Sequence, residues 1–148
     1  YVPSQFLDIK KKQRYVTSGA QADMGFTIPA AIGVSAAKKN GEVIGITGDG
    51  SFQTNIQELQ TIKHYGFPVK LFVWNNSGYL SIRTTQKKFF EGRFIGVDKD
   101  SGVSLPDIKK ITDAYGIKYF KIETVEDLEE GIQNVLDWDG PVVCEVIC

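Results

Sequence analysis

The chain has 148 residues, of which 42% are hydrophobic and 24% charged, and its formal net charge at pH 7 is −1. This length suits one domain, and the composition excludes disordered and collagen-like classes. The balanced charge leaves no basic footprint for nucleic acid, so Lys10, Lys11 and Lys12 are interpreted as a solvated surface run. No run of about 18 apolar residues is present, so the sequence predicts no membrane-spanning helix.

Apolar runs alternate with amphipathic segments along the chain. The alanine-rich pattern of residues 29–39 predicts a helix that ends at Asn40-Gly41, and the apolar run 43–47 predicts a strand. A helix over 53–65 leads to a strand over 69–74, and one face of this helix carries Ile56, Leu59, Ile62 and Tyr65. Two further helices over 105–115 and 125–136 alternate with strands over 118–122 and 142–147. This alternation predicts an α/β, doubly wound domain with a largely parallel sheet of about six strands and helices on both faces.

Two cysteines, Cys144 and Cys148, are four residues apart near the end of the chain. On a strand this spacing is too wide for a ready disulfide, which favours a reduced, cytoplasmic protein. The chain begins at Tyr1 rather than Met and stops at the end of an apolar run. We therefore expect residues 1–148 to be a single domain of a longer multidomain enzyme.

Two of the expected strands end in unusual loops, Gly48-Asp49-Gly50-Ser51 and Asn75-Asn76-Ser77-Gly78-Tyr79. In parallel α/β sheets, ligands bind beyond the carboxyl ends of the strands. If the two strands are neighbours, the single crossover between them brings both loops to one edge of the sheet.

The two loops offer hard oxygen donors. Asp49 supplies a carboxylate, Asn76 an amide oxygen, and the loop around Gly78 a backbone carbonyl. This set suits magnesium, which also accepts water and phosphate oxygens. The glycines permit close approach of the backbone to a ligand, and the amides near Ser51 favour an anion. Neither loop contains a lysine or arginine, so a cation must neutralise the bound phosphate.

The motif Gly-Asp-Gly, followed after 24 residues by Asn-Asn, resembles the thiamine-diphosphate-binding motif. Further segments resemble the C-terminal cofactor domain of the acetolactate synthase family, and the likeness extends from about residue 16 to residue 146. These segments are residues 24–26 with 29–33, 57–59 with Thr61, 68–70, Gln86 with 89–90, and 140–142. The resemblance implies the thiamine-diphosphate-binding fold, with thiamine diphosphate and Mg²⁺ as cofactors.

The resemblance also implies roles for individual residues. Asp49, the Asn76 side chain and the Gly78 carbonyl would bind magnesium. Gly50 and Ser51 would contact the diphosphate, with Tyr79 and Leu80 touching it or the thiazolium side. Met24 matches the large apolar residue that keeps the cofactor bent, and its backbone and that of Ala22 would face the aminopyrimidine. No catalytic side chain is assigned to this chain, because family members draw an activating glutamate from a second, pyrimidine-binding domain.

The parent enzyme implied by the resemblance decarboxylates a 2-oxo acid, with pyruvate as the expected substrate, and passes the resulting carbanion to an acceptor. Family sites form between two chains, so a homodimer or larger assembly is expected. Ala20 and Ala22 replace glycines common in the family. Ser81 and Thr85 stand where acetolactate synthases tend to carry Met and Trp, and this difference leaves the acceptor open.

Three alternatives remain open from the sequence. The parent could be a simple 2-oxo acid decarboxylase or oxidase, the chain could be a non-catalytic cofactor-binding subunit, or it could be a generic nucleotide-binding α/β domain. Individual residues also have structural interpretations: Asp49 as a helix cap, Asn75-Asn76 as a turn, and Met24, Tyr79 and Leu80 as core. Glu58 is expected to make a structural hydrogen bond and His64 to lie on the surface. Arg83 and Arg93 are candidates for binding a substrate carboxylate or a sugar diphosphate.

Overall fold

The apolar runs form one parallel sheet in the computed structural model, which describes residues 5–148. Its strands are β1 (Val43–Gly48), β2 (Val69–Asn75), β3 (Lys118–Ile122) and β4 (Val142–Ile147). They lie in the order β1-β2-β4-β3. The connection from β2 to β3 therefore skips one position in the sheet, which β4 occupies. The parallel α/β prediction is confirmed.

The expectation of about six strands was wrong for the described residues, which form four. Each of the four apolar runs in the sequence became a strand, and no further run of this kind exists to supply another. The long connections over residues 7–23 and 90–107 are mostly exposed and adopt turns and irregular backbone instead.

Helices connect the strands and cover the sheet. They are α2 (Thr27–Ala37), α3 (Asp49–Thr54), α4 (Glu58–Tyr65), α5 (Leu80–Phe89), α6 (Ile108–Ala114) and α7 (Leu128–Asp137). The backbone of Gly66 ends α4 in the left-handed region, at φ 64°, which glycine adopts without steric cost. The Asp107 carboxylate caps α6 by accepting a 2.9 Å hydrogen bond from the Lys110 amide.

Two helix predictions need correction. The helix expected over 53–65 is divided into α3 and α4, because Asn55 ends α3 with φ −135° and three turn residues intervene. The helix α5 was not predicted, and none of its residues is buried.

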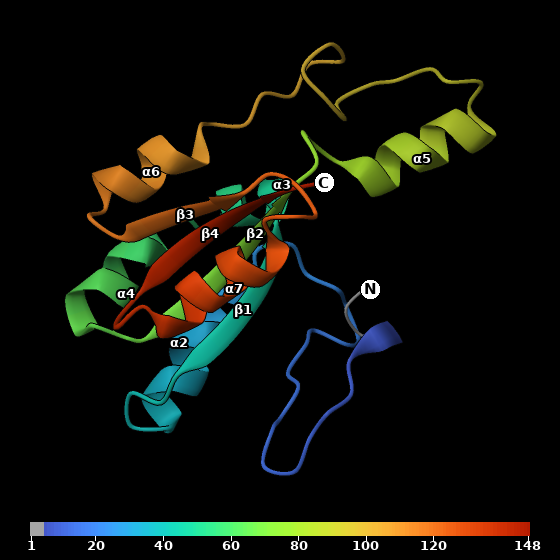
Figure 1. Cartoon of the computed structure of the whole chain (residues 1–148). Coiled ribbons are helices and arrows are strands. Elements are labelled where there is room, and N and C mark those ends of the chain that lie inside the picture. Colours follow the sequence, from blue (N-terminus) through green and yellow to red (C-terminus); the bar gives the residue numbers. More distant parts are fainter. Residues whose placement is uncertain (1–4) are drawn as a thin grey trace.

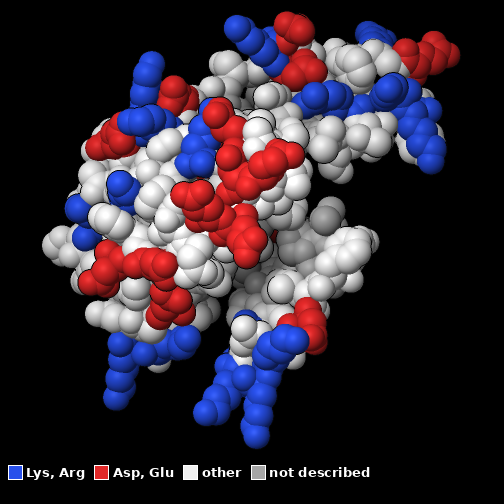
Figure 2. All heavy atoms as spheres, in the orientation of Figure 1, with Lys and Arg blue, Asp and Glu red and all other residues white. Residues whose placement is uncertain are grey.

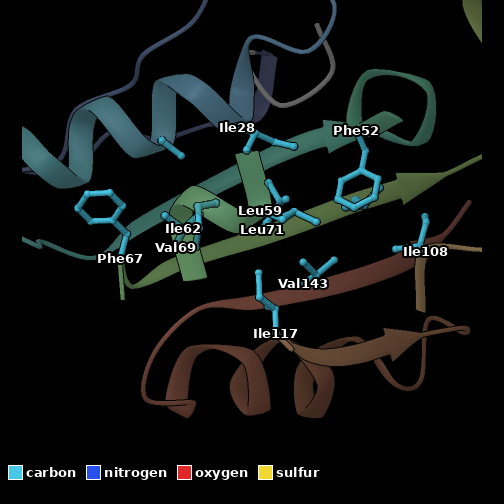
Figure 3. Packing of buried hydrophobic residues seen from close by; sticks show 12 residues of the cluster. Ile28, Phe52, Leu59, Ile62, Phe67, Val69, Leu71, Ile108, Ile117 and Val143 are labelled. Carbon is cyan, nitrogen blue, oxygen red and sulfur yellow. The ribbon is translucent and has the colours of Figure 1, made fainter. Parts of the chain in front are cut away.

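The main core lies on the face of the sheet covered by α2, α4 and α6 (Figure 3). Ile28, Leu59 and Ile62 from these helices meet Leu71 and Val143 from the central strands. Each such fully buried side chain contributes about 1.5–3 kcal/mol relative to an exposed one. A smaller cluster on the other face joins Phe72, Val142 and Cys144 to Ile122 and Val135, under α7. Helices on both faces agree with the doubly wound prediction (Figure 1).

A buried lysine holds the turn between α7 and β4 against the sheet. Lys70 is 1% exposed, and its ammonium donates to the carbonyl of Trp138 and, at 3.2 Å, to that of Gly140. Its ammonium is also 3.8 Å from a carboxylate oxygen of Glu42. These partners compensate part of the cost of burying the charge.

The helix α5 extends away from the sheet (Figure 1). Phe89 and Phe90, at its end, are 67% and 60% exposed. Figure 2 shows charges of both signs on one face, with acidic side chains gathered over α7. Lys10, Lys11 and Lys12 are exposed, as the interpretation of a solvated run required. Across residues 5–148, none of the helices has the length and apolar character needed to cross a membrane.

Candidate functional site

The two motif loops meet at one edge of the sheet. Strands β1 and β2 are parallel neighbours, and Gly48 is paired with Trp74 in their register. Asp49 therefore follows β1 directly beside the place where Asn75 ends β2. The crossover through α3 and α4 is the one that the sequence predicted.

Asp49 is the centre of this junction. Its side chain is buried, with the residue 4% exposed, and Oδ1 accepts a 2.8 Å hydrogen bond from the Gly50 amide. Oδ2 accepts a 2.9 Å hydrogen bond from the Gly78 amide, which ties the second loop to the first. Asp49 is the first residue of α3 and Gly48 is its cap, so interpreting Asp49 as a simple helix cap was wrong.

The second loop presents an amide oxygen that lacks a partner. Oδ1 of Asn76 is buried and accepts no hydrogen bond within the described residues. A buried polar atom without a partner costs free energy, and a bound cation is one way to satisfy it. Asp49 likewise has no Lys or Arg side chain within 4.0 Å in the described part of the chain. An oxygen-coordinated cation therefore fits these two side chains.

Backbone packing holds the loop in place. Gly78 has φ 131°, and a Cβ at this position would lie 2.3 Å from the carbonyl oxygen of Val97. The Tyr79 amide donates to that same oxygen at 2.8 Å. Only glycine allows the two segments to approach this closely.

Arg83 holds the loop after β2 through its backbone carbonyls. Its Nη2 donates to the carbonyls of Asn76, at 3.2 Å, and Ser77, at 3.4 Å. Its Nε is 3.7 Å from the carboxylate of Asp98, whose pKa is lowered first by the Ser101 hydroxyl and also by Arg83. The Arg83 side chain is therefore engaged in the loop, which the substrate-binding hypothesis did not foresee. Arg93 is exposed.

The Gly50 backbone lies beneath an aromatic ring. A Cβ on Gly50 would lie 2.3 Å from Cε1 of Tyr79, so the ring occupies the space that a side chain would need. Tyr79 and Ser51 are half-buried, whereas Leu80 is 49% exposed. Leu80 therefore does not belong to the core, contrary to the structural alternative.

Ala22 and Met24 lie on a turn near the same edge. Ala22 has φ 54°, the left-handed region that favours glycine, which agrees with the glycine common there in the resembling family. Met24 is 48% exposed, so it is not a core residue. The neighbouring Gly25 carbonyl accepts a 3.0 Å hydrogen bond from Nδ2 of Asn55. Asn55 thus fastens this turn to the junction of α3 and α4, a role that the sequence did not indicate.

A cavity of about 680 Å³ lies beside the loop that follows β2. Its lining includes Asp49, Asn75, Ser77, Tyr119 and Glu145. Asp49 is the only residue of the expected cofactor-binding set that lines it, so the cavity borders the junction without coinciding with the expected cofactor site. Glu145 was missed by the sequence analysis, although a carboxylate inside an apolar strand is itself a signal.

The remaining candidates have structural roles or exposed positions. Glu58 accepts a 3.0 Å hydrogen bond from the Thr61 hydroxyl, as expected. His64 is exposed near the end of α4. Both cysteines are free, and Cys144 is buried. The described residues contain no group of three or more His, Cys, Asp or Glu that could hold a metal, but the expected site needs only one carboxylate.

Comparison with known proteins places this geometry in context. Residues 2–146 match the thiamine pyrophosphate enzyme C-terminal TPP-binding domain. The acetolactate synthase large subunit of Pyropia yezoensis is 39% identical over 145 residues, which cover 97% of this chain and 24% of the relative. The chloroplastic acetolactate synthase of Arabidopsis thaliana is 36% identical over 149 residues, covering 98% of this chain and 22% of the relative. The chain thus spans about a quarter of the length of these relatives.

Proposed function

This chain belongs to the family of C-terminal TPP-binding domains of thiamine pyrophosphate enzymes, and from that premise we propose that it holds thiamine diphosphate through a magnesium ion. Asp49, the Asn76 side chain and the Gly78 carbonyl are the proposed protein ligands. The observation that carries this proposal is the buried Oδ1 of Asn76, which has no partner in the described residues and belongs to the loop bonded to Asp49.

Charge supports a cation at this position. Burying a carboxylate costs free energy, which hydrogen bonds and an opposite charge reduce. The Gly50 and Gly78 amides supply hydrogen bonds to Asp49. The arginine that contacts the second loop, Arg83, is committed to loop carbonyls and Asp98. Magnesium, with oxygen ligands at about 2.0–2.1 Å, supplies the missing positive charge.

The proposed diphosphate contacts come from the start of α3 and from the loop after β2. Gly50 has no side chain and its amide already donates to Asp49, while Ser51 offers its amide and hydroxyl. The ring of Tyr79 lies over Gly50 and would form one wall of the proposed diphosphate site. Leu80, the first residue of α5, is exposed and available for contact.

We assign Ala22 and Met24 to the organic part of the cofactor. Met24 is close to half exposed and offers an apolar surface, and the backbone beside it is fixed through Gly25 and Asn55. When bound, thiamine diphosphate supplies the ring-carbon nucleophile for decarboxylating a 2-oxo acid. The contribution of this chain is to bind and shape the cofactor.

We propose that the whole protein is a 2-oxo acid decarboxylase and carboligase of acetolactate synthase type, acting on a substrate such as pyruvate. Ser81 and Thr85, where acetolactate synthases tend to carry Met and Trp, lie exposed one turn apart on α5 and share a 3.1 Å hydrogen bond from the Thr85 hydroxyl to the Ser81 carbonyl. Because the chain differs from acetolactate synthases at these two positions, a simple decarboxylase or an oxidase is the second candidate. Identifying the products that the full-length protein forms from pyruvate separates the three.

The proposed partner of this domain is a pyrimidine-binding domain with an activating glutamate, in a homodimer or larger assembly. The purified 148-residue chain should then show no turnover of pyruvate. Turnover by the chain alone would refute the need for the second domain. A non-catalytic subunit is the alternative, and the length of the gene distinguishes the two.

Calorimetric titration tests the binding proposal. Thiamine diphosphate should bind in the presence of Mg²⁺ and bind much more weakly in EDTA. ATP titrated under the same conditions should bind less tightly than thiamine diphosphate. Binding that is independent of Mg²⁺, or tighter binding of ATP, would refute the proposal.

A further inference from the structure

A carboxylate stands where the pattern of strand β4 calls for an apolar side chain. Glu145 is 8% exposed, and its neighbours in the strand, Cys144 and Val143, are buried apolar residues. Its Oε1 accepts a 2.6 Å hydrogen bond from Nδ2 of Asn75, and its Oε2 accepts the hydroxyl of Tyr119. A buried carboxylate with both oxygens engaged holds its partners in a defined geometry.

Asn75 transmits this constraint to the loop that follows β2. While its Nδ2 donates to Glu145, its Oδ1 accepts a 3.0 Å hydrogen bond from the Ser77 amide. Only one orientation of the amide satisfies both partners, because the nitrogen donates and the oxygen accepts. The Asn75 carbonyl also accepts a 3.0 Å hydrogen bond from the Cys148 amide, which fixes its backbone to the end of β4. The carboxylate thus selects the side-chain orientation that forms the turn at Ser77.

That turn carries the two proposed magnesium ligands of the second loop. Asn76 lies between Asn75 and Ser77, and Gly78 follows them. We propose that Glu145 is a positioning residue for the magnesium site, which it orders through the Asn75 amide and the turn at Ser77. This inference rests on the proposed function, because it assigns Glu145 to the support of that same site.

Tyr119 fixes the position of the Glu145 carboxylate through the oxygen that Asn75 does not contact. Burial, together with the hydrogen bond to Glu145, raises the pKa of Tyr119, so its phenol remains protonated and donates. Asn75, Tyr119 and Glu145 all line the cavity beside the loop. The loop therefore has room to move when Glu145 is replaced. Removing a group that bonds a metal ligand directly typically changes metal affinity by about 10- to 100-fold. Glu145 acts one residue further away, through Asn75, so its removal should have an effect at the lower end of this range.

The test measures the Mg²⁺ dependence of thiamine diphosphate binding by calorimetry in the full-length protein. Glu145→Ala should weaken the apparent Mg²⁺ affinity by about 10-fold, the lower end of the range for direct partners of metal ligands. Glu145→Gln retains an acceptor for Asn75 and should restore most of that affinity. The matched control, Glu123→Gln, removes an exposed carboxylate that pairs with Lys121, and it should leave the affinity unchanged.

A donor–acceptor exchange tests the hydrogen bond itself. Asn75→Asp places two acceptors against each other and should weaken Mg²⁺ binding. Combining it with Glu145→Gln restores one donor and one acceptor, because the introduced glutamine amide donates to the introduced aspartate, and it should recover affinity. A role confined to folding would lower stability in these variants without this pattern of loss and recovery.

The outcomes separate this inference from the proposed function. Loss of Mg²⁺ affinity in Glu145→Ala, with recovery in Glu145→Gln or the double variant, supports the positioning role. A wild-type protein whose binding depends on Mg²⁺, alongside Glu145→Ala and Asn75→Asp variants of equal Mg²⁺ affinity, overturns the positioning role alone. A wild-type protein that binds without Mg²⁺ overturns the proposed function and the inference built on it.

Discussion

Asp49 and Gly78, 29 residues apart in the chain, are joined by a 2.9 Å hydrogen bond from the Gly78 amide to Oδ2 of the carboxylate. This bond connects the loop after β1 to the loop after β2. The ring of Tyr79, which lies over Gly50, is a second contact between the same two loops. The site therefore depends on backbone that is held at a fixed distance from one buried side chain.

Gly78→Ala should destabilise the protein and disorder the second loop. The new Cβ would lie 2.3 Å from the Val97 carbonyl oxygen, at φ 131°. We expect the free energy of unfolding to fall by about 1–3 kcal/mol, measured by urea denaturation. Gly96→Ala is the matched control, because φ is also positive but no atom lies within 4 Å. Equal losses in the two variants would show that the contact with Val97 does not matter.

Gly50→Ala should displace the ring of Tyr79. Its Cβ would lie 2.3 Å from Cε1 of that ring, whereas a Cβ at Gly48, in the same motif, would meet no atom within 4 Å. We expect a loss of about 1–3 kcal/mol in unfolding free energy for Gly50→Ala, with little change for Gly48→Ala. Adding Tyr79→Ala to Gly50→Ala should recover part of that loss. Failure of the second substitution to relieve the first would argue against the steric explanation.

The two thiols should differ in reactivity. Burial raises the pKa of Cys144 from 9.0 to about 12, and the negative charge of Glu145 adds to this effect. Cys148 is exposed, and the pKa of its thiol is also raised, first by partial burial and then by the charge of Asp49. A thiol reagent at about pH 8 should therefore modify Cys148 in the native protein and Cys144 only after denaturation. Cys148→Ser provides the control, since it should leave the native protein unlabelled.

The same shift predicts a loss of stability in alkali. From pH 9.0 to about pH 12 the Cys144 thiol ionises in the unfolded chain while the folded chain retains the proton. The unfolded state then binds fewer protons, so the free energy of unfolding falls as the pH rises. Cys144→Ala should show a shallower decline over this range, measured by urea denaturation at each pH. A decline of equal slope in both proteins would contradict the assignment.

The positions of the strands were predictable because each is a short apolar run bounded by polar or glycine residues. The meeting of the two motif loops was predictable too, because one crossover joins parallel neighbours. The division between α3 and α4 was not, since it accompanies the hydrogen bond from Asn55 to the Gly25 carbonyl, 30 residues away. Local periodicity carries no information about such a partner.

The support of the second loop was equally hidden. Asn75 and Glu145 are 70 residues apart, and only the placement of β4 beside β2 brings them together. Arg83 was a candidate for binding a substrate carboxylate or a sugar diphosphate. It lies on α5, a helix that was not anticipated, and its guanidinium donates to the loop carbonyls. In both cases the sequence showed the charged residue, and the tertiary structure determined its partner.

The measurement that tests the central claim most directly is the binding of thiamine diphosphate to an Asp49→Ala variant, titrated with and without Mg²⁺. The matched control is Asp100→Ala, which removes an exposed carboxylate outside the two loops. Circular dichroism establishes that both variants retain their helices and strands. We predict that Asp49→Ala loses the Mg²⁺-dependent part of the affinity and that Asp100→Ala keeps it. Undiminished Mg²⁺-dependent binding by a folded Asp49→Ala variant would contradict the account.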